Sequence, residues 1–311
     1  MSTGTGPQLK PPVALVVGAF AAIYLIWGST YLGIRFAIET MPPFIMGGGR
    51  FLLAGGALYG WLRWRGTPAP DVSHWRNAII VGALLLGIGN GGVNWAEQKV
   101  ASGVVALIIA VTPLWFALLD WLRPGGSRPR VWTMLGIVIG FFGMVWLVTS
   151  QGAGTPGSLE PSRVGGVICA SIAWATGSLY ARYTPKPETP LMGGALQMLA
   201  GGTILIFFGL VMGEADAFSM ARVSSRSLIA FLYLTLVGSL VGFTAYSWLL
   251  KVSTPARIST YAYVNPVIAV FLGWSLAGER LNSHVLGAAA VIVLAVIIIS
   301  TASMPNRAGR A

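Results

Sequence analysis

Apolar residues fill most of this chain in long runs, separated by short segments rich in proline, glycine or charged residues. A helix of about 20 apolar residues is long enough to cross roughly 30 Å of hydrocarbon. Because such runs leave no room for a sizeable soluble domain, the pattern predicts an all-α membrane protein. Turn residues and charges place ten transmembrane helices over residues 13–34, 43–62, 78–96, 101–122, 131–149, 164–182, 190–212, 227–250, 255–277 and 284–301.

The two halves of the chain resemble each other. Residues 27–35 and 174–182 share the pattern W-x7-R, and a tryptophan and a proline have the same spacing in residues 95–113 and 248–266. Each half contains five expected spans, an odd number, so the second half must enter the membrane from the opposite side. The duplication therefore predicts two inverted five-helix repeats, at 13–149 and 164–301, joined by a polar linker at 150–163.

The charged residues indicate the orientation of these helices. If the N-terminus lies inside, most of the lysines and arginines fall in the inner connections. By the positive-inside rule, both termini are then cytoplasmic and the linker at 150–163 is periplasmic. This pattern predicts a multi-pass protein of a bacterial-type inner membrane.

Composition changes this picture little. Hydrophobic residues make up 55% of the 311 residues and charged residues 9%, against roughly 25% charged in an ordinary globular domain. The net charge is +11, but the basic residues are spread between the apolar runs and form no single patch. We therefore expect the protein to contact the lipid bilayer and not to bind nucleic acid. The single cysteine, Cys169, lies in an apolar run and is predicted to be a buried small hydrophobe.

Two blocks of sequence carry a resemblance to a known family. They are NWAEQKVASGVVALIIAVTPLW at 94–115 and YVNPVIAVFLGWSLAGERLNSHVLGAAAVI at 263–292. With the two five-helix halves, they resemble the EamA-type proteins of the drug/metabolite transporter superfamily, and within it the aromatic amino acid exporters of the YddG type. The resemblance implies a ten-helix inner-membrane carrier that moves small metabolites outward. Closely similar motifs in the superfamily serve amino acids, nucleotides, sugars and drugs.

A proline follows a polar residue at matching places in the fourth and ninth spans, as Thr112-Pro113 and Asn265-Pro266. A proline inside a helix removes a backbone hydrogen bond and can bend it. Each proline could be a packing kink, but their shared spacing favours a pair of hinges, Pro113 and Pro266, for alternating access.

Aromatic and hydroxyl residues cluster in the first and sixth spans, and asparagines and tyrosines in the third, eighth and ninth. Flat rings and small hydrogen-bonding groups suit a cavity for an amino acid. The same residue types also pack helices and form interfacial belts, which is the competing interpretation. The cavity candidates are Trp27, Ser29, Tyr31, Asn90, Asn94, Trp174, Thr176, Ser178, Tyr246, Tyr261, Tyr263 and Asn265.

Arg50 is the charged residue placed well inside an expected span. It could bind a substrate carboxylate, or it could be structural, reaching toward the interface or bonding carbonyls. The acidic residues fall in loops or at span ends, Glu97 among them, so no titratable group is expected at the midplane. We therefore expect a facilitator, or a carrier whose proton dependence, if any, is indirect.

These patterns together predict an inner-membrane carrier, and a monomer, that exports aromatic and other neutral amino acids by alternating access. The alternatives are export of another small metabolite or drug, or a channel-like pore. Metal-ligand spacing, a phosphate loop and a catalytic constellation are absent from the sequence, so we expect no metal, no cofactor and no enzyme activity.

Overall fold

The computed structural model describes residues 12–126, 128–149, 160–253 and 260–302. Helices and no strands occur in this part of the chain, and helix covers most of the described residues of every expected span. The ninth span is described only from Thr260 onward, because residues 254–259 lie outside the described part, and its helix begins at Tyr261.

The first half forms five helical segments, two of them composite. The third segment joins a π-helix, η1, to two α-helices, and the fourth is divided between α5 and α6. The elements are α1 (Val13–Ala37), α2 (Pro43–Trp64), α3 (Val72–Gly82), η1 (Ala83–Asn90), α4 (Gly91–Ala96), α5 (Ser102–Ile109), α6 (Thr112–Leu122) and α7 (Val131–Thr149).

The second half follows the same order, with two short helices added before α11. Its elements are α8 (Pro161–Tyr183), α9 (Pro190–Val211), α10 (Glu214–Ala217), η2 (Met220–Arg222), α11 (Ser225–Tyr233), η3 (Leu234–Val241), α12 (Gly242–Val252), α14 (Tyr261–Ala277) and α15 (Ser283–Ala302).

Seven helices of the described part are long and apolar enough to cross a membrane, and two shorter apolar helices lie in 264–277 and 283–299. The helix α2, which carries Arg50 and Arg63, is not among them. The expected arrangement of ten spans in two inverted repeats therefore stays a prediction.

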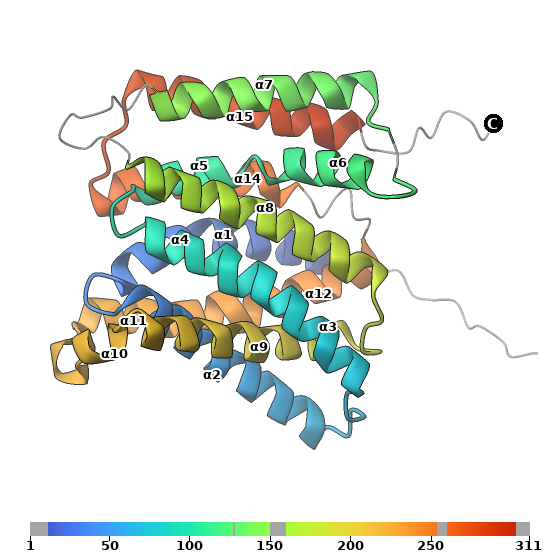
Figure 1. Ribbon diagram of the computed structural model, residues 1–311, viewed down its shortest axis with the longest axis vertical. Helices are drawn as coiled ribbons and strands as arrows, with labels where there is room; N and C mark the ends of the chain where they lie inside the picture. Colours follow the sequence, from blue (N-terminus) through green and yellow to red (C-terminus); the bar gives the residue numbers. More distant parts are fainter. Residues whose placement is uncertain (1–11, 127, 150–159, 254–259, 303–311) are drawn as a thin grey trace, which may run out of the picture.

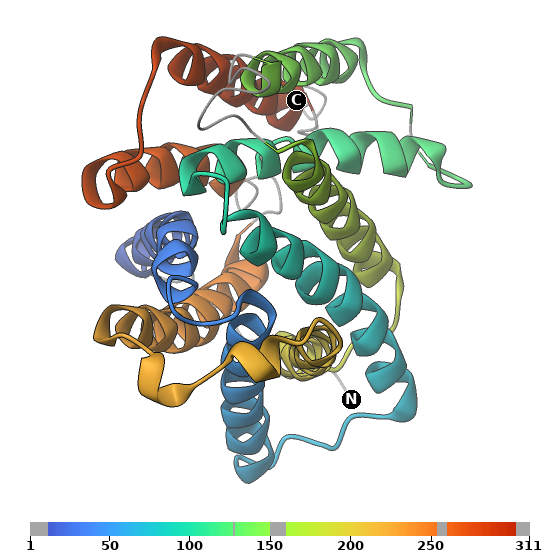
Figure 2. The same ribbon diagram turned by 60° about the vertical axis from the view of Figure 1, so that its left-hand side comes forward.

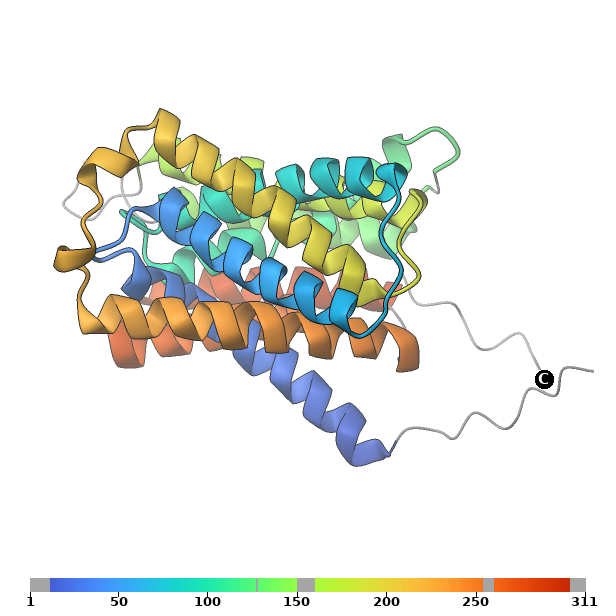
Figure 3. The same ribbon diagram turned by 90° about the horizontal axis from the view of Figure 1, so that it is seen from below.

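The helices lie roughly along one direction and form a bundle in which α7 and α15 pair on one side and α2 and α9 on the other (Figure 1). Figure 2 shows the α7–α15 pair as a separate layer above the remaining helices. The N-terminal turns of α1 extend away from the other helices (Figure 3), and the side chains of Val13, Leu15 and Val17 are exposed there. We call the end at which α4 ends and α5 begins the Glu97 end; it is on the left in Figure 1.

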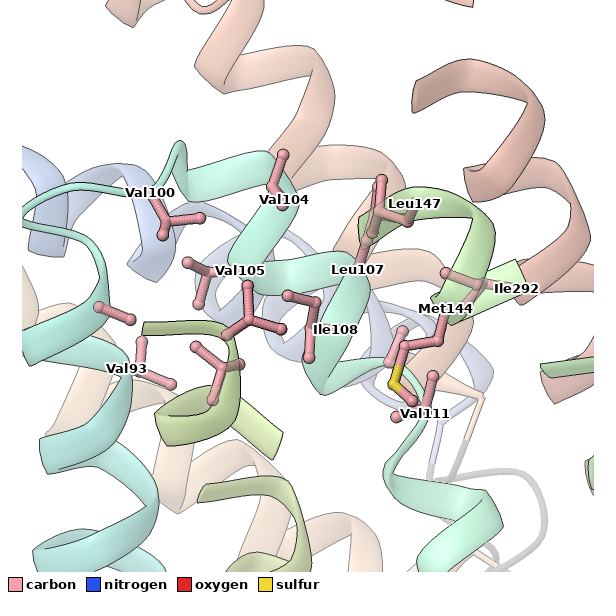
Figure 4. Packing of buried hydrophobic residues seen from close by; sticks show 14 of the residues in the cluster. Val93, Val100, Val104, Val105, Leu107, Ile108, Val111, Met144, Leu147 and Ile292 are labelled. Atoms are coloured by element: carbon pink, nitrogen blue, oxygen red, sulfur yellow. The ribbon is translucent and has the colours of Figure 1, made fainter. Parts of the chain in front are cut away.

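The apolar core is centred on α5. Every residue from Ser102 to Ile108 is buried, as expected for a helix that is apolar on all sides. Val104, Leu107 and Ile108 pack among residues of α4, α7 and α15, including Met144 of α7 (Figure 4). This packing holds α5 in the middle of the bundle, next to α8 and α14.

Small residues allow close contact between α9 and its neighbours. A Cβ atom on Gly82 would lie 2.7 Å from the Gln197 carbonyl oxygen and 2.9 Å from the Gly201 nitrogen. A Cβ atom on Gly48 would lie 2.8 Å from the Gly202 carbonyl oxygen. In membrane proteins, glycines at such interfaces let helix backbones approach closely.

The two π-helices occupy corresponding places in the chain. Both contain eight residues, and η3 begins and ends 151 residues after η1. In η3, the Ser239 hydroxyl donates to the Leu234 carbonyl oxygen at 3.0 Å. Because π-bulges are rare and concentrate at functional sites, both segments are of interest for function.

The structure differs from the sequence expectations at two points. The two prolines are not equivalent: Pro266 lies inside α14, whereas Pro113 stands in the first turn of α6, after a break in the helix at residues 110–111. A proline is well tolerated in a first turn because its missing N–H has no partner there anyway. The prediction that Cys169 is buried is wrong, since it is exposed on α8.

Candidate functional site

Three predicted cavity residues form one aromatic group at the contact of α1, α12 and α14. The Trp27 ring lies 5.2 Å from the Tyr246 ring and 5.2 Å from the Tyr261 ring, between ring centroids. The rings of Tyr246 and Tyr261 are 6.4 Å apart. The Trp27–Tyr261 and Tyr246–Tyr261 pairs meet edge to face, an arrangement that aromatic pairs favour. We call these three residues the aromatic group.

One face of α1 connects this group to a charged region. Trp27, Tyr31 and Arg35 are spaced by four residues and so lie along one side of the helix. Tyr31 interacts electrostatically with Tyr261 and with Glu97. At the end of the face, the Arg35 guanidinium donates to the Glu97 carbonyl oxygen at 2.5 Å.

Asn90, Asn94 and Glu97 form a polar stripe along η1 and α4. Asn94 and Glu97 are fully buried, and their spacing of four and three residues places all three on one helix face. The Asn94 amide donates to the Pro43 carbonyl oxygen at 3.2 Å. A Cβ atom on Gly47 would lie 2.3 Å from the Asn94 side-chain nitrogen, so α2 needs a glycine at this contact.

Arg50 of α2 faces this polar stripe. It is only 3% exposed, and its guanidinium donates to the Asn90 side-chain oxygen at 2.5 Å. The guanidinium carbon also lies 4.3 Å from the centre of the Phe51 ring. Arg50 is therefore held inside the bundle by the side chain of another predicted cavity residue, Asn90.

The other predicted residues lie outside these two groups. The Ser29 hydroxyl is 2.5 Å from the Tyr233 hydroxyl. Trp174 packs over Gly89 of η1, whose added Cβ would lie 3.0 Å from the indole. Thr176 is exposed and donates to the Ile172 carbonyl oxygen, and Ser178 is half-buried.

Asn265 is buried in α14 near the aromatic group. With its side-chain amide turned over, its nitrogen donates to the Tyr261 and Tyr24 carbonyl oxygens. Such contacts fit a role in joining α14 to α1. The side chain of Tyr263 lies outside the described part of the structure.

Glu97 is a further residue of this site, and it is not among the predicted cavity residues. It follows the last residue of α4, as expected of a group at a span end, but its side chain has no exposed surface. Helical spacing from Asn90 and Asn94 was the available signal. Its burial could not be predicted, because it depends on α1 and α2 covering the end of α4.

Polar contacts tie the helices together at the Glu97 end. The Glu279 carboxylate, which follows α14, accepts hydrogen bonds from the Ser102 and Gly103 amides at the start of α5, at 2.6 and 3.1 Å. The Glu214 carboxylate accepts from the Phe44 and Ile45 amides at the start of α2. Burial raises the pKa of the Glu214 carboxyl group, and these amide hydrogen bonds oppose the shift. Both glutamates satisfy amide groups that have no partner within their helix.

Two arginines make further contacts between helices at the Glu97 end. Arg163 at the start of α8 donates to the Trp95 carbonyl oxygen and to the Gln98 side chain, the latter at 3.0 Å. Arg226 of α11 pairs with Glu39 at 3.3 Å. At the Glu97 end, hydrogen bonds therefore connect α8 to α4 and the residues after it, and an ion pair connects α11 to the segment after α1.

The sequence of this chain is similar to those of known proteins. The EamA-like transporter family matches residues 14–149 and again residues 163–301. The inner membrane transporter YedA of Escherichia coli K12 is 39% identical over 296 residues, which cover 94% of this chain and 92% of YedA. Protein PecM of Dickeya dadantii is 24% identical over 287 residues, 91% of each chain.

A crystal structure with 18% sequence identity superimposes with a TM-score of 0.62, over 93% of this chain and 98% of the other, and this likeness shows the fold alone. The expected particular similarity to aromatic amino acid exporters stays a prediction. The similarity to YedA and the apolar helices support a multi-pass inner-membrane protein with a transporter role. Because the two family matches span most of the sequence, this chain belongs to the EamA-like transporter family.

Proposed function

We propose that the protein is a carrier that exports amino acids, aromatic and other neutral ones, across the inner membrane by alternating access. In this proposal ten helices cross the membrane as two inverted repeats, and both termini are cytoplasmic. The Glu97 end is then periplasmic. Transport is facilitative, driven by the higher concentration of substrate in the cytoplasm.

The observation that carries the proposal is the continuous face of α1 between the aromatic group and the polar stripe. Trp27, Tyr246 and Tyr261 offer flat apolar surfaces, while Arg50 and Glu97 bring a guanidinium and a carboxyl group that interact electrostatically. Tyr31 lies within electrostatic range of both groups. An aromatic amino acid has this same division into a ring and a zwitterion, so apolar and charged groups of the protein would match those of the substrate.

The paired π-helices support movement of two related halves. A π-helix replaces the regular hydrogen-bond ladder of an α-helix and often marks a functional position. The segments η1 and η3 have equal length and lie at corresponding places in the two halves. Inverted repeats with interrupted helices at the midplane are typical of carriers.

Counterflow in proteoliposomes tests the proposed function. Vesicles preloaded with unlabelled amino acid should accumulate labelled phenylalanine, tryptophan and other neutral amino acids, with saturation and trans-stimulation. Flux that does not saturate would indicate a channel-like pore. A response to another metabolite or drug, with none to any amino acid, would reject the proposed substrate class. Uphill accumulation driven by a pH gradient alone would reject the facilitative mechanism.

The unequal positions of the prolines predict unequal effects on transport. Pro266→Ala allows α14 to form the backbone hydrogen bond that proline prevents, so we expect the initial rate of counterflow to fall several-fold. Pro113→Ala changes the first turn of α6, where proline costs little, so we expect a smaller change. Equal rates in wild type, both single variants and the double variant would leave only a packing role for the two prolines.

A further inference from the structure

The buried polar atoms around the polar stripe are not all paired. Both carboxylate oxygens of Glu97, the side-chain oxygen of Asn94 and the Nε atom of Arg50 are buried without a hydrogen-bond partner. Buried polar groups in native proteins are nearly always hydrogen-bonded, because an unmade bond costs about 1–3 kcal/mol. This group of unpaired buried atoms therefore has the features of a binding site for a polar ligand.

The neighbouring charges do not satisfy Glu97. Arg35 donates to the backbone carbonyl of Glu97 at 2.5 Å, and Arg50 donates to the Asn90 side chain at 2.5 Å. The Glu97 carboxylate interacts electrostatically with both arginines, with Glu279 and with Tyr31. Glu279 is itself occupied, because it accepts the amide and hydroxyl groups of Ser102 at the start of α5. The two arginines therefore attract the Glu97 carboxylate only from a distance and leave its oxygens without donors.

The unpaired atoms have a definite chemistry. Three of them accept hydrogen bonds, two on Glu97 and one on Asn94, and one of them, on Arg50, donates. Glu97 is three residues after Asn94, so these acceptors belong to neighbouring positions on one helix face. A primary ammonium group has three N–H donors and a positive charge. It matches this set, whereas a carboxylate or phosphate group would bring more acceptors and a further negative charge.

We propose that Glu97 and Asn94 bind the ammonium group of a substrate that carries a primary amine, with the Arg50 Nε atom left for an acceptor group of the same molecule. This assignment rests on the proposed transport function and makes it more specific, because it states how the zwitterion is oriented. The ammonium group lies toward the Glu97 end, and the substrate side chain extends along α1 toward the aromatic group. Since Glu97 has no exposed surface, the substrate enters only when the helices separate.

Three ligands with a common ring separate the contributions of the charged groups. Phenylalanine carries the ammonium and carboxylate groups, phenethylamine only the ammonium group, and phenylpropanoate only the carboxylate group. Binding to the full chain in detergent is measured by the rise in unfolding temperature over a ligand titration. For the wild type we expect both amines to bind more tightly than phenylpropanoate.

The variant Glu97→Gln keeps the size of the side chain and removes its charge. We expect the affinity for phenylalanine and phenethylamine to fall at least about tenfold, because a hydrogen bond to a charged group is lost, with the weak response to phenylpropanoate unchanged. Glu39→Gln is the matched control. Glu39 lies at the same end, but it is 39% exposed and paired with Arg226, so its replacement should leave all three affinities unchanged.

Each possible result decides a separate point. If Glu97→Gln binds both amines like the wild type, Glu97 does not hold the ammonium group, even if phenylalanine is transported. If phenethylamine binds in a Glu97-dependent manner but no amino acid is transported, the ammonium site stands and the proposed substrate class fails. A wild type that binds phenylpropanoate more tightly than phenethylamine overturns the inference without any variant, so the test does not depend on the folding of Glu97→Gln. The ligand titrations can be repeated over a range of pH. If Glu97→Gln binds both amines like the wild type but its unfolding temperature no longer changes with pH as that of the wild type does, Glu97 is a proton-binding site instead.

Discussion

Arg50→Met is expected to lower the free energy of unfolding by about 2 kcal/mol, as is typical when a buried polar group loses its hydrogen bond to a charged partner. Arg50 is 3% exposed, donates to Asn90 and interacts electrostatically with the fully buried Glu97. Methionine fills a similar volume without the charge. The variant therefore leaves Glu97 less compensated and the Asn90 oxygen without its donor, and both changes destabilise the folded state.

A double-mutant cycle separates these two effects. If the attraction between Arg50 and Glu97 stabilises the fold more than the hydrogen bond to Asn90 does, Arg50→Met combined with Glu97→Leu should recover much of the lost stability, since no buried carboxylate then remains. Unfolding can be followed by tryptophan fluorescence in mixtures of mild and denaturing detergent. Arg63→Met is the control on the same helix, because Arg63 is exposed and donates to the Thr67 carbonyl oxygen nearby. Equal stability of Arg50→Met and wild type would show that Arg50 is not held by these contacts.

Gly82→Ala is the second substitution for which we expect a large effect, a loss of about 2 kcal/mol, as is typical of overpacking in a closely packed interior. The added methyl group would lie 2.7 Å from the Gln197 carbonyl oxygen and 2.9 Å from the Gly201 nitrogen. Both are backbone atoms of α9, so no side-chain rotation relieves the contact. The helices α3 and α9 must move apart, which also weakens packing next to η1.

Gly56→Ala provides the matched comparison. Gly56 lies in α2, and an added Cβ atom has no heavy atom within 4 Å. Alanine favours the helix over glycine by up to about 1 kcal/mol, so this variant should be as stable as the wild type or slightly more stable. The same detergent unfolding assay ranks the three proteins. Equal destabilisation of the two variants would mean that the effect of Gly82→Ala comes from a general intolerance of these helices and not from contact with α9.

Helix packing decided several features that no local pattern could show. The prolines occur at matching positions in the sequence, yet one begins a helix and the other lies inside one. The backbone hydrogen bonds around Pro113 depend on where the fourth segment breaks, between α5 and α6. The π-helices were likewise not predicted, because their composition resembles that of any glycine-containing apolar helix.

The sequence by itself determined that this is an all-helical protein, that helices lie over the expected apolar segments, and that it resembles EamA-type proteins. These properties depend on the length of apolar runs and on short motifs, which are local. Tertiary structure alone decided that Glu97 is fully buried, that Arg50 meets Asn90, and that Trp27 joins Tyr246 and Tyr261. Some of these contacts join residues that are more than two hundred positions apart in the sequence. Hydrophobicity can place a residue along a helix, but which neighbours cover a charge depends on how separate helices pack.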